Sequence, residues 1–461
     1  MAKLKTFVKN KITIQLQNTN ILHDDQVMLG EAYMKQWRIP ENQPLTLRYG
    51  SSRNTVKVIS TPRSDGLRIH SALAGKLSLH QGVQLRMHYR AGSQTLSLGP
   101  LIGIMVSREY HGASSDKLFG AITPYCKEVA EACRMQGAFV FFFTPNDIHA
   151  NHQSVGGWSY NGRWSKSSFP VPNVVHNRLT SRKLENRPSV QLFMKEAKSR
   201  YHTSIFNEQY LNKTEVFQAL RKDTSLHHYL PESHLFNHYQ MLKTMCSKYS
   251  VIFLKPVNGS LGQGILRISK QAAGYSCEFT NLSGAGRKSF SSLPKLFSAI
   301  SGKMRARRYQ IQQGLRLISI DRRPVDFRAL VQKDKTGNWS ITSIVGRIAA
   351  NHHFVSNLAK GGSLSSVRDA LIKSNLGAQQ RQSAYLGLRR SAIAIANGID
   401  AQIPSHFGEL GVDLAVDTRG KVWLIEVNSK PSKNDETPQP DHQIRPSVKQ
   451  MVQYARYIAG F

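Results

Sequence analysis

The segment that most constrains the fold of this chain is residues 253–264, with the sequence FLKPVNGSLGQG. The apolar residues 251–254 predict a buried strand, which delivers Lys255 into a glycine-rich turn. Glycine has no Cβ atom, so this backbone can bend sharply and approach a ligand closely, and its N–H groups beside a lysine suit phosphate oxygens. Residues 265–269 then alternate as a second strand, so we expect a strand–loop–strand unit. Taken alone, such a glycine-rich hairpin is more often an ordinary turn.

A second informative segment is residues 408–430, GELGVDLAVDTRGKVWLIEVNSK. Alternating residues from 412 onward, a turn at 418–420 and a strand over 422–427 predict an antiparallel pair. Asp413 and Glu426 can then face the same side, with Asn428 two residues further along that face. Two carboxylates and an amide oxygen suit Mg²⁺, which completes its shell with phosphates and water. The alternative is an ordinary hairpin with solvated acids.

Further charged residues lie in apolar surroundings between these two segments. Asp326 and Arg328 share a face of the strand pattern 325–331, and Arg347 lies near the end of another strand-like run, 339–348. Asn357 follows in a polar loop. Arginines at strand ends can stabilise charge on a transferring phosphoryl group, although each one singly is more often a surface ion pair.

The order of these elements resembles the ATP-grasp superfamily, and within it the YheC/YheD endospore coat-associated family. The motifs are also similar to those of RimK-type glutamate ligases. The resemblance covers roughly residues 213–431 and rests on eight segments in this order: NKTEVFQAL, FLKPVNGSLGQG, IQQGL, DFRALV, GRIA, VSNLAKGG, GVDLAVD and LIEVNSKP.

This resemblance implies a protein that binds ATP together with Mg²⁺, which Mn²⁺ could replace. It assigns Lys213 and Lys255 to ATP phosphates, and Gly259, Ser260, Gly262 and Gly264 to a lid loop. It places Gln312, Gln313 and Leu315 at the adenine hinge, Asp326 near the ribose or phosphates, Arg328, Arg347 and Asn357 on the catalytic side, and Asp413, Glu426 and Asn428 at the metal.

Three departures from the pattern concern the adenine hinge, the spacing after it and one contact to phosphate or acceptor. Gln313 stands where many members have a glutamate in the hinge, and it carries no charge. The spacing from Gln313 to Asp326 is longer than we expect, so residues 316–324 could form an inserted turn. Val355 stands where RimK-type loops usually carry an arginine.

The reaction implied by the resemblance is ATP-dependent activation of a carboxylate. An acyl phosphate would form and be captured by an amine, a thiol or another nucleophile of an acidic or polymeric acceptor, in a ligase associated with spores. Positioning and electrostatics supply most of such catalysis, so no Ser or Cys nucleophile is needed. Two other interpretations stay open. One is a structural spore protein that binds nucleotide without turnover, and the other is an ATP-dependent kinase on the same fold.

Charge is the other strong property of the sequence. The 62 Lys and Arg residues against 29 Asp and Glu give a formal net charge of +33, which predicts an acidic polymer or anionic surface as partner. The basic residues are dispersed and no DNA-reading motif is in view, so we expect no sequence-specific binding of nucleic acid. No apolar run reaches the roughly 18–20 residues of a membrane span. Neither a signal-peptide core nor a disulfide framework is evident, which favours the cytoplasm.

The length of 461 residues suggests about three domains of an α/β, or α+β, multidomain protein. Residues 1–98 contain a repeat at an offset of 40 and predict a small β-barrel, similar to a double-psi barrel, that serves in binding or assembly. Residues 99–210 predict an open α/β domain that precedes the ATP-grasp domain at 211–461. In the second domain we expect an exposed loop at 156–166, and in the third a long helix at 379–397 that ends at Gly398. The repeat is clearest in Leu45, Leu47 and Tyr49, which match Leu85, Met87 and Tyr89.

Overall fold

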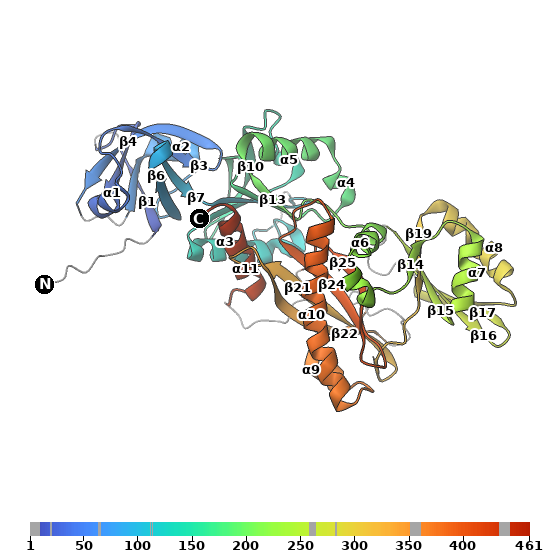
Figure 1. Cartoon of the computed structure of the whole chain (residues 1–461). Helices are drawn as coiled ribbons and strands as arrows, with labels where there is room; N and C mark the ends of the chain where they lie inside the picture. The colour runs from blue at the N-terminus through green and yellow to red at the C-terminus, as the bar shows by residue number, and fades with distance from the viewer. Residues whose placement is uncertain are drawn as a thin grey trace. The chain divides into compact units, whose positions relative to one another are not determined.

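The chain folds into two compact units, seen in the computed structural model of Figure 1. Unit 1 consists of Met1–Gln209, Lys333–Asn338 and Gln439–Phe461, and unit 2 of Tyr210–Gln332 and Trp339–Pro438. The structure describes residues 10–18, 21–62, 66–110, 112, 114–257, 264–281, 284–350, 361–432 and 443–461.

The N-terminal part of unit 1 is a closed barrel of seven strands in the order β1-β5-β2-β4-β3-β7-β6. Alternate residues along β3, such as Leu45, Leu47 and Tyr49, are buried inside it, as the period-2 pattern requires. Each copy of the repeat gives a short helix followed by two strands, so the predicted repeat-built barrel is confirmed. The elements are β1 (Lys11–Gln17), β2 (Gln26–Gly30), α1 (Glu31–Trp37), β3 (Pro44–Tyr49), β4 (Ser52–Thr61), β5 (Gly66–His70), α2 (Ser71–Leu77), β6 (Gln84–Arg90), η1 (Ala91–Ser93) and β7 (Thr95–Gly99).

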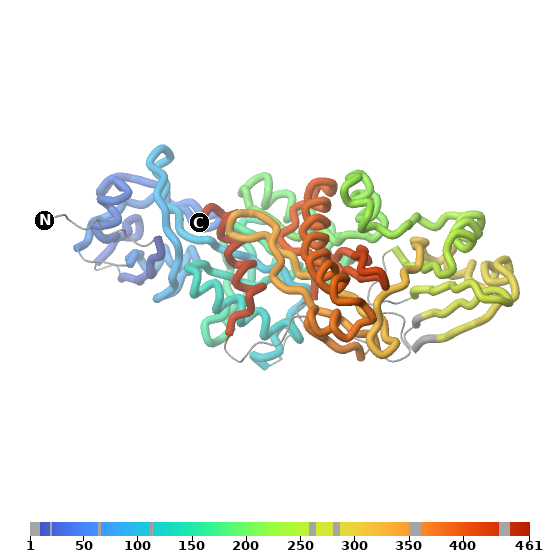
Figure 2. Tube along the Cα trace, turned by 60° about the horizontal axis from the view of Figure 1, so that its bottom comes forward, coloured from blue at the N-terminus to red at the C-terminus, as the bar shows by residue number. Residues whose placement is uncertain are grey.

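The rest of unit 1 is a six-stranded sheet in the order β11-β10-β9-β8-β12-β13. Its neighbouring strands β9, β8, β12 and β13 are parallel, which confirms the predicted open α/β sheet. Apolar residues of α5 pack on one face, and those of α3 and the C-terminal helix α11 pack on the other. The path of these helices along the sheet can be followed in the tube of Figure 2. The elements are β8 (Leu101–Met105), η2 (Gly120–Ile122), α3 (Thr123–Gln136), β9 (Phe139–Phe143), η3 (Pro145–Asp147), β10 (Ser154–Tyr160), β11 (Trp164–Pro170), β12 (Val174–Asn177), α4 (Arg182–Glu185), α5 (Pro188–Tyr201), β13 (Ser204–Phe206) and α11 (Pro446–Ile458).

Two features of this sheet differ from the expectation. Residues 156–166 form most of the β10–β11 hairpin instead of an exposed loop, and Trp158 and Trp164 pack on the core beside α3. The helix α11 belongs to unit 1, whereas the sequence grouped it with the nucleotide-binding segment 211–461. We propose that residues 1–98, 99–210 and 211–461 nevertheless act as three functional domains.

Unit 2 contains a first sheet of six strands in the order β14-β19-β15-β16-β17-β18. Helices α7 and α8 pack against it through Leu242, Met245, Leu296 and Ile300. The pair β15–β16 flanks the glycine-rich segment, so the predicted strand–loop–strand unit is present. The elements are β14 (Ser233–Leu235), α7 (Tyr239–Lys248), β15 (Val251–Pro256), β16 (Leu266–Gln271), β17 (Gly274–Asn281), β18 (Gly284–Phe290), α8 (Leu293–Ala306) and β19 (Tyr309–Gln313).

The second sheet of unit 2 has the order β23-β22-β21-β24-β25, with β20 paired to β21. The short β20–β21 hairpin turns at Asp321 and Arg322, which both have positive φ, and this turn lies within residues 316–324, where the hinge spacing suggested an inserted turn. Helices α6, α9 and α10 cover one face of the sheet with a common apolar core. The elements are α6 (Lys213–Leu220), η4 (Thr224–Tyr229), β20 (Ser319–Ile320), β21 (Arg323–Lys333), β22 (Trp339–Ile348), β23 (Ser363–Ser366), α9 (Val367–Ile372), α10 (Ala378–Gln402), β24 (Glu409–Val416) and β25 (Val422–Asn428).

The long helix α10 does not end at Gly398, as its glycine predicted, but continues to Gln402. A Cβ atom at Gly398 would lie 2.5 Å from Leu226 Cδ1 and 2.9 Å from Leu220 Cδ2. The glycine is thus present to let two buried leucines pack against the helix, and not to stop it.

Two further expectations concern the whole chain. Within the described ranges, no helix combines the length and apolar character that crossing a bilayer needs. All four cysteines are buried and free of disulfides.

Candidate functional site

Two carboxylates face each other on the strand pair β24–β25. Asp413 is in register with Glu426, and Asn428 Nδ2 lies 3.5 Å from Oδ2 of Asp413. The register shifts between Asp413 and Leu414, which places a β-bulge at this pair, as is common next to functional sites. The three predicted metal ligands are therefore brought together on one face of the sheet.

Two arginines from neighbouring strands hold the Asp413 carboxylate. Arg328 on β21 donates to it through Nε and, at 3.0 Å, through Nη2. Arg347 on β22 lies 3.2 Å from Asp413 and donates through Nε to Asp326 at 2.6 Å. Burial raises the pKa of Asp413, but the two guanidinium groups outweigh it and lower that pKa overall. The arginines, which the resemblance assigned to the catalytic side, thus also fix a predicted metal ligand.

One lysine pairs with the other carboxylate of the pair, and a second lysine lies within its electrostatic influence. Lys213 is the first residue of α6, whose start is capped by the Asn212 side chain, and its Nζ lies 2.9 Å from Glu426 Oε1. Lys255, near the end of β15, is half-buried. Burial lowers the pKa of Lys255 to about 8, with Glu426 opposing this shift and Lys213 adding to it. Two cations beside a carboxylate form a polar cluster suited to an anion that carries its own metal.

Gln312 supplies an unsatisfied donor at this cluster. Its Oε1 accepts a hydrogen bond from Lys255 Nζ, while its buried Nε2 has no hydrogen-bond partner among the described residues. Leaving a buried N–H group unpaired costs free energy, so such groups are usually satisfied by a ligand, water or protein. The orphaned amide therefore fits an acceptor atom of a bound molecule next to Lys255.

The other hinge residues have structural partners. Gln313 Oε1 accepts from the backbone N–H of Glu232 at 2.7 Å, and the two residues also exchange a backbone hydrogen bond. The Gln313 side chain thus links the residue before β14 to β19, an acceptor role that needs no charge. Leu315 lies half-buried in the loop after β19.

Of the predicted lid loop, Gly264 alone lies inside the described ranges. It has a φ of +72°, a conformation that favours glycine, and its carbonyl accepts a hydrogen bond from the Tyr309 hydroxyl at 3.3 Å. Gly259, Ser260, Gly262 and the predicted catalytic Asn357 lie outside the described residues, as does Val355.

The donor set fits a hard divalent cation that is shared with a substrate. Nowhere in the described ranges do three His, Cys, Asp or Glu side chains come together as a metal-binding group. Asp413 and Glu426 supply two carboxylates, so a cation here would need the Asn428 amide oxygen and outside oxygens. This is the pattern that Mg²⁺ adopts with phosphates and water.

Sequence reasoning missed Glu232, whose backbone N–H donates a hydrogen bond to the side chain of the hinge residue Gln313. It accepts from the Tyr249 hydroxyl at 2.7 Å and pairs with Lys248 and His234. Partial burial raises its pKa, but these partners lower it to about 2. No local pattern marks Glu232, because Lys248 and Tyr249, at the end of α7, lie 16 and 17 residues further along the chain.

Comparison with known proteins shows the family. The description "YheC/D like ATP-grasp" matches residues 202–458, which include every residue of the site described above. The chain belongs to the YheC/D-like ATP-grasp family. The match leaves the N-terminal barrel outside, so the family description covers unit 2 and only parts of unit 1.

Two curated relatives and one solved structure illustrate the relationship of this YheC/D-like chain. It is 26% identical over 440 residues to the endospore coat-associated protein YheD of Bacillus subtilis (strain 168), covering 89% of this chain and 94% of YheD. It is 22% identical over 315 residues to YheC of the same organism, covering 67% of this chain and 85% of YheC. The D-alanyl-alanine synthetase A structure from Vibrio cholerae O1 biovar eltor shares 11% identity with a TM-score of 0.43, covering 78% of this chain and 98% of that one.

Proposed function

We propose that this chain binds ATP with Mg²⁺ in unit 2 and uses it to activate a carboxylate for ligation. The observation that carries the proposal is the polar cluster of unit 2. It contains the two carboxylates on β24 and β25, two lysines, and a buried amide N–H group without a hydrogen-bond partner among the described residues. Its central members are Lys213, Lys255, Gln312, Asp413 and Glu426. Membership of the YheC/D-like ATP-grasp family supports the same assignment.

Each group of the cluster would have its own task. Lys213 and Lys255 would neutralise phosphate oxygens, and the Gln312 amide would donate to an acceptor atom of the nucleotide. Asp413, Glu426 and Asn428 would hold Mg²⁺, which lowers the charge repulsion between the triphosphate and an incoming anion.

The proposed reaction has two steps. A carboxylate oxygen attacks the γ-phosphorus, the bond to the β–γ bridging oxygen breaks, and ADP leaves. An amine nitrogen, or a thiol sulfur, then attacks the acyl carbon, phosphate departs and the nucleophile loses its proton. The protein contributes mainly orientation and charge stabilisation, for which Arg328 and Arg347 are placed beside Asp413.

The first experiment measures binding and turnover together. ATP with Mg²⁺ is titrated calorimetrically into the full chain, and ADP release is followed with a mixture of amino acids and dicarboxylates as acceptors. Hydroxylamine is added as a general nucleophile, because it converts an acyl phosphate into a hydroxamate whatever the natural amine is. We expect metal-dependent binding, ADP release and hydroxamate.

A matched pair of variants gives the control. Glu426→Gln should weaken Mg²⁺-dependent binding, while Glu278→Gln should not. The two glutamates are similarly exposed, at 28% and 24%, and each makes one ion pair at 2.9 Å. Absence of nucleotide binding in the wild type would refute the proposal.

Two other functions correspond to different outcomes of this experiment. Binding without ADP release would indicate a nucleotide-binding structural protein. ADP release with a phosphorylated product that hydroxylamine does not trap would indicate a kinase.

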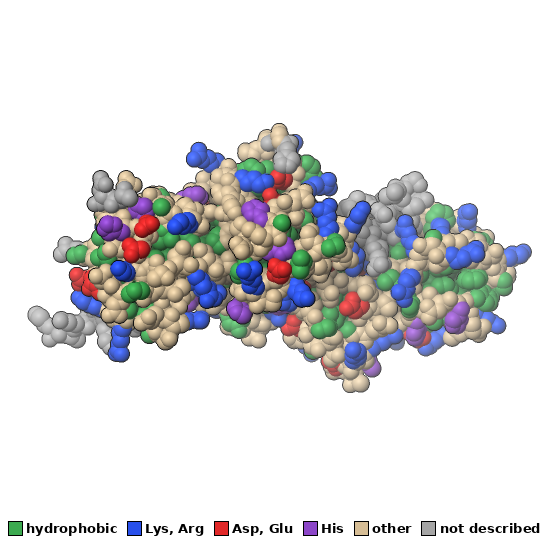
Figure 3. All heavy atoms as spheres, turned by 90° about the horizontal axis from the view of Figure 1, so that it is seen from above, with side chains coloured by type: hydrophobic (Ala, Val, Ile, Leu, Met, Phe, Trp, Pro, Cys, Tyr) green, Lys and Arg blue, Asp and Glu red, His purple; other side chains and the backbone are tan. Residues whose placement is uncertain are grey.

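The setting of the reaction is proposed from the relatives and the charge. Since YheD and YheC are named as endospore coat-associated proteins, we propose that this chain is spore-associated as well, after synthesis in the cytoplasm. The net charge of +33 supports an acidic or polymeric acceptor, and Figure 3 shows lysines and arginines spread over the face it presents.

A further inference from the structure

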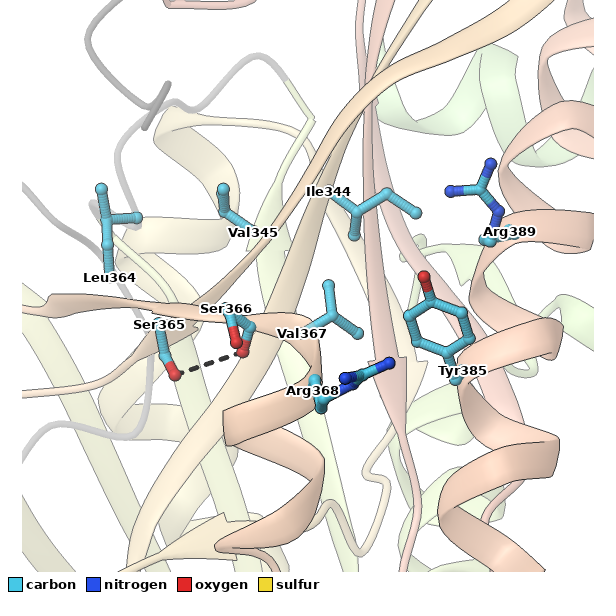
Figure 4. Close-up of a pocket in the computed structure, with 9 residues that line it drawn as sticks. All are labelled: Ile344, Val345, Leu364, Ser365, Ser366, Val367, Arg368, Tyr385 and Arg389. Atoms are coloured by element: carbon cyan, nitrogen blue, oxygen red, sulfur yellow. Dashed lines mark hydrogen bonds between the residues drawn. The ribbon is translucent and has the colours of Figure 1, made fainter. Parts of the chain in front are cut away.

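A pocket of about 540 Å³ lies in unit 2 at the β23 end of the second sheet, between that edge and helices α9 and α10 (Figure 4). Ile344 and Val367 supply apolar surface, and Leu364 and Tyr385 are 39% and 37% exposed around it. Apolar surface left accessible next to polar groups is typical of a binding site.

The pocket is separate from the nucleotide and metal cluster. None of its lining residues belongs to that cluster. Strand residues from both faces of the sheet line the pocket, since Ile344 is three residues from Arg347 on β22 whereas Leu364 of β23 is in register with Arg347. Ile344 packs on the core that α10 covers, while Arg347 faces Asp326 and Asp413.

The charged side chains that line the pocket are both positive. Arg368 on α9 and Arg389 on α10 are both exposed, and neither pairs with a carboxylate of a described residue. Figure 4 shows the Arg368 side chain extending toward Tyr385 of α10. Helix α10 carries no acid from Ala378 until Asp400. Asp369, the residue after Arg368, accepts a hydrogen bond from the Ser366 hydroxyl at 2.7 Å.

The pocket also borders backbone that can pair with another chain. Strand β23 is the terminal strand of its sheet, and no described strand pairs with its outer edge. All four of its residues are exposed or only half-buried. An extended peptide can add to such an edge through main-chain hydrogen bonds, while alternate side chains enter a neighbouring pocket.

We propose that this pocket binds an extended acidic peptide segment of a partner protein. The peptide main chain adds to the edge of β23, its carboxylates meet Arg368 and Arg389, and its apolar side chains contact Ile344, Val367 and Tyr385. Guanidinium groups bind carboxylates through two parallel hydrogen bonds, which makes these arginines suited to select acidic side chains. This proposal does not depend on turnover of ATP.

The test uses the full chain and a fluorescein-labelled peptide in which glutamate and valine alternate. Fluorescence polarisation should show binding, and a peptide of the same composition with its glutamates and valines in two blocks should bind more weakly. Arg368→Gln and Arg389→Gln should each raise the Kd about threefold to tenfold, as expected for loss of one charge-assisted contact. Arg390→Gln is the matched control, because Arg390 is also exposed on the same helix and is not among the residues that line the pocket.

A second variable tests the main-chain pairing. The alternating peptide is N-methylated at every second residue, in each of the two registers. One register should lose binding and the other should keep it, since only alternate N–H groups of the peptide face β23. Equal losses for Arg389→Gln and Arg390→Gln, equal binding of the block peptide, or indifference to N-methylation would each overturn the proposal. Displacement of the peptide by free glutarate at equal concentration would assign the pocket to a small carboxylate instead.

Discussion

At the scale of single residues, the lowered pKa of Lys255 leads to the most direct prediction. Burial lowers its pKa to about 8, so part of the population is neutral in mildly alkaline solution. Triphosphate bound beside it would raise that pKa again, because an anion favours the charged form. We therefore expect ATP binding to take up close to one proton at pH 9 and almost none at pH 7. The affinity should fall by roughly tenfold per pH unit between about pH 8 and pH 10.

Calorimetry in two buffers of different ionisation enthalpy measures this proton uptake. Lys255→Arg should abolish it, since arginine stays charged throughout this range. Lys270→Arg, at an exposed position on β16, is the control and should keep the uptake. An affinity that does not depend on pH from 7 to 10 would show that Lys255 does not meet the phosphates.

Arg328 gives a second prediction at this scale, concerning stability. Removing it leaves the buried Asp413 carboxylate with Arg347 as its remaining guanidinium partner. Arg328→Ala should lower the free energy of unfolding by about 3 kcal/mol, the lower end of the range for a broken buried pair. Arg323, on the same strand as Arg328, is half-buried and pairs with the exposed Asp321, so Arg323→Ala should cost at most about 1 kcal/mol. Urea denaturation at pH 7 compares the two, and equal losses would contradict the structural role given to Arg328.

The same network has a defined pH dependence. Because the pKa of Asp413 is lowered in the folded state, its stabilising contribution is present above the unfolded pKa near 3.8. The contribution is lost as the pH falls further through the folded pKa. The difference in stability between the wild type and Arg328→Ala should therefore shrink on acidification below that value.

At the scale of elements, two helical glycines should respond in opposite ways to alanine. In α8 a Cβ atom at Gly302 would meet nothing within 4 Å, so Gly302→Ala should stabilise by about 0.5–1 kcal/mol through helix propensity. In α10 the Cβ atom at Gly398 would collide with Leu226 and Leu220, which are buried. Gly398→Ala should therefore destabilise by about 1–2 kcal/mol despite the same gain in propensity. Thermal unfolding of both variants checks the sign, and stabilisation by both would show that the leucines can move aside.

These glycines also show why some elements could be predicted and others could not. The pair β24–β25 was predictable because its period-2 pattern and turn residues are local properties of the chain. The hairpin β10–β11 was not predictable, because the need for glycine at position 157 comes from a residue far away in the sequence. A Cβ atom at Gly157 would lie 2.6 Å from the Phe141 ring. The partners of Arg328 and Arg347 were hidden for a similar reason, since they depend on the strand order β22-β21-β24.

At the scale of the whole molecule, the net charge of +33 dominates the behaviour toward polyanions. Cations that are dispersed, as on the face in Figure 3, attract an anionic polymer without reading its sequence. We expect two DNA duplexes of equal length and unrelated sequence to bind with the same affinity. Between about 50 and 200 mM salt both affinities should fall by orders of magnitude, because binding releases counterions. Fluorescence polarisation with each labelled duplex measures this, with polyglutamate as competitor, which should displace both. Tighter binding of one duplex than of the other at the higher salt concentration would contradict this expectation, because such a preference would require contacts to base edges.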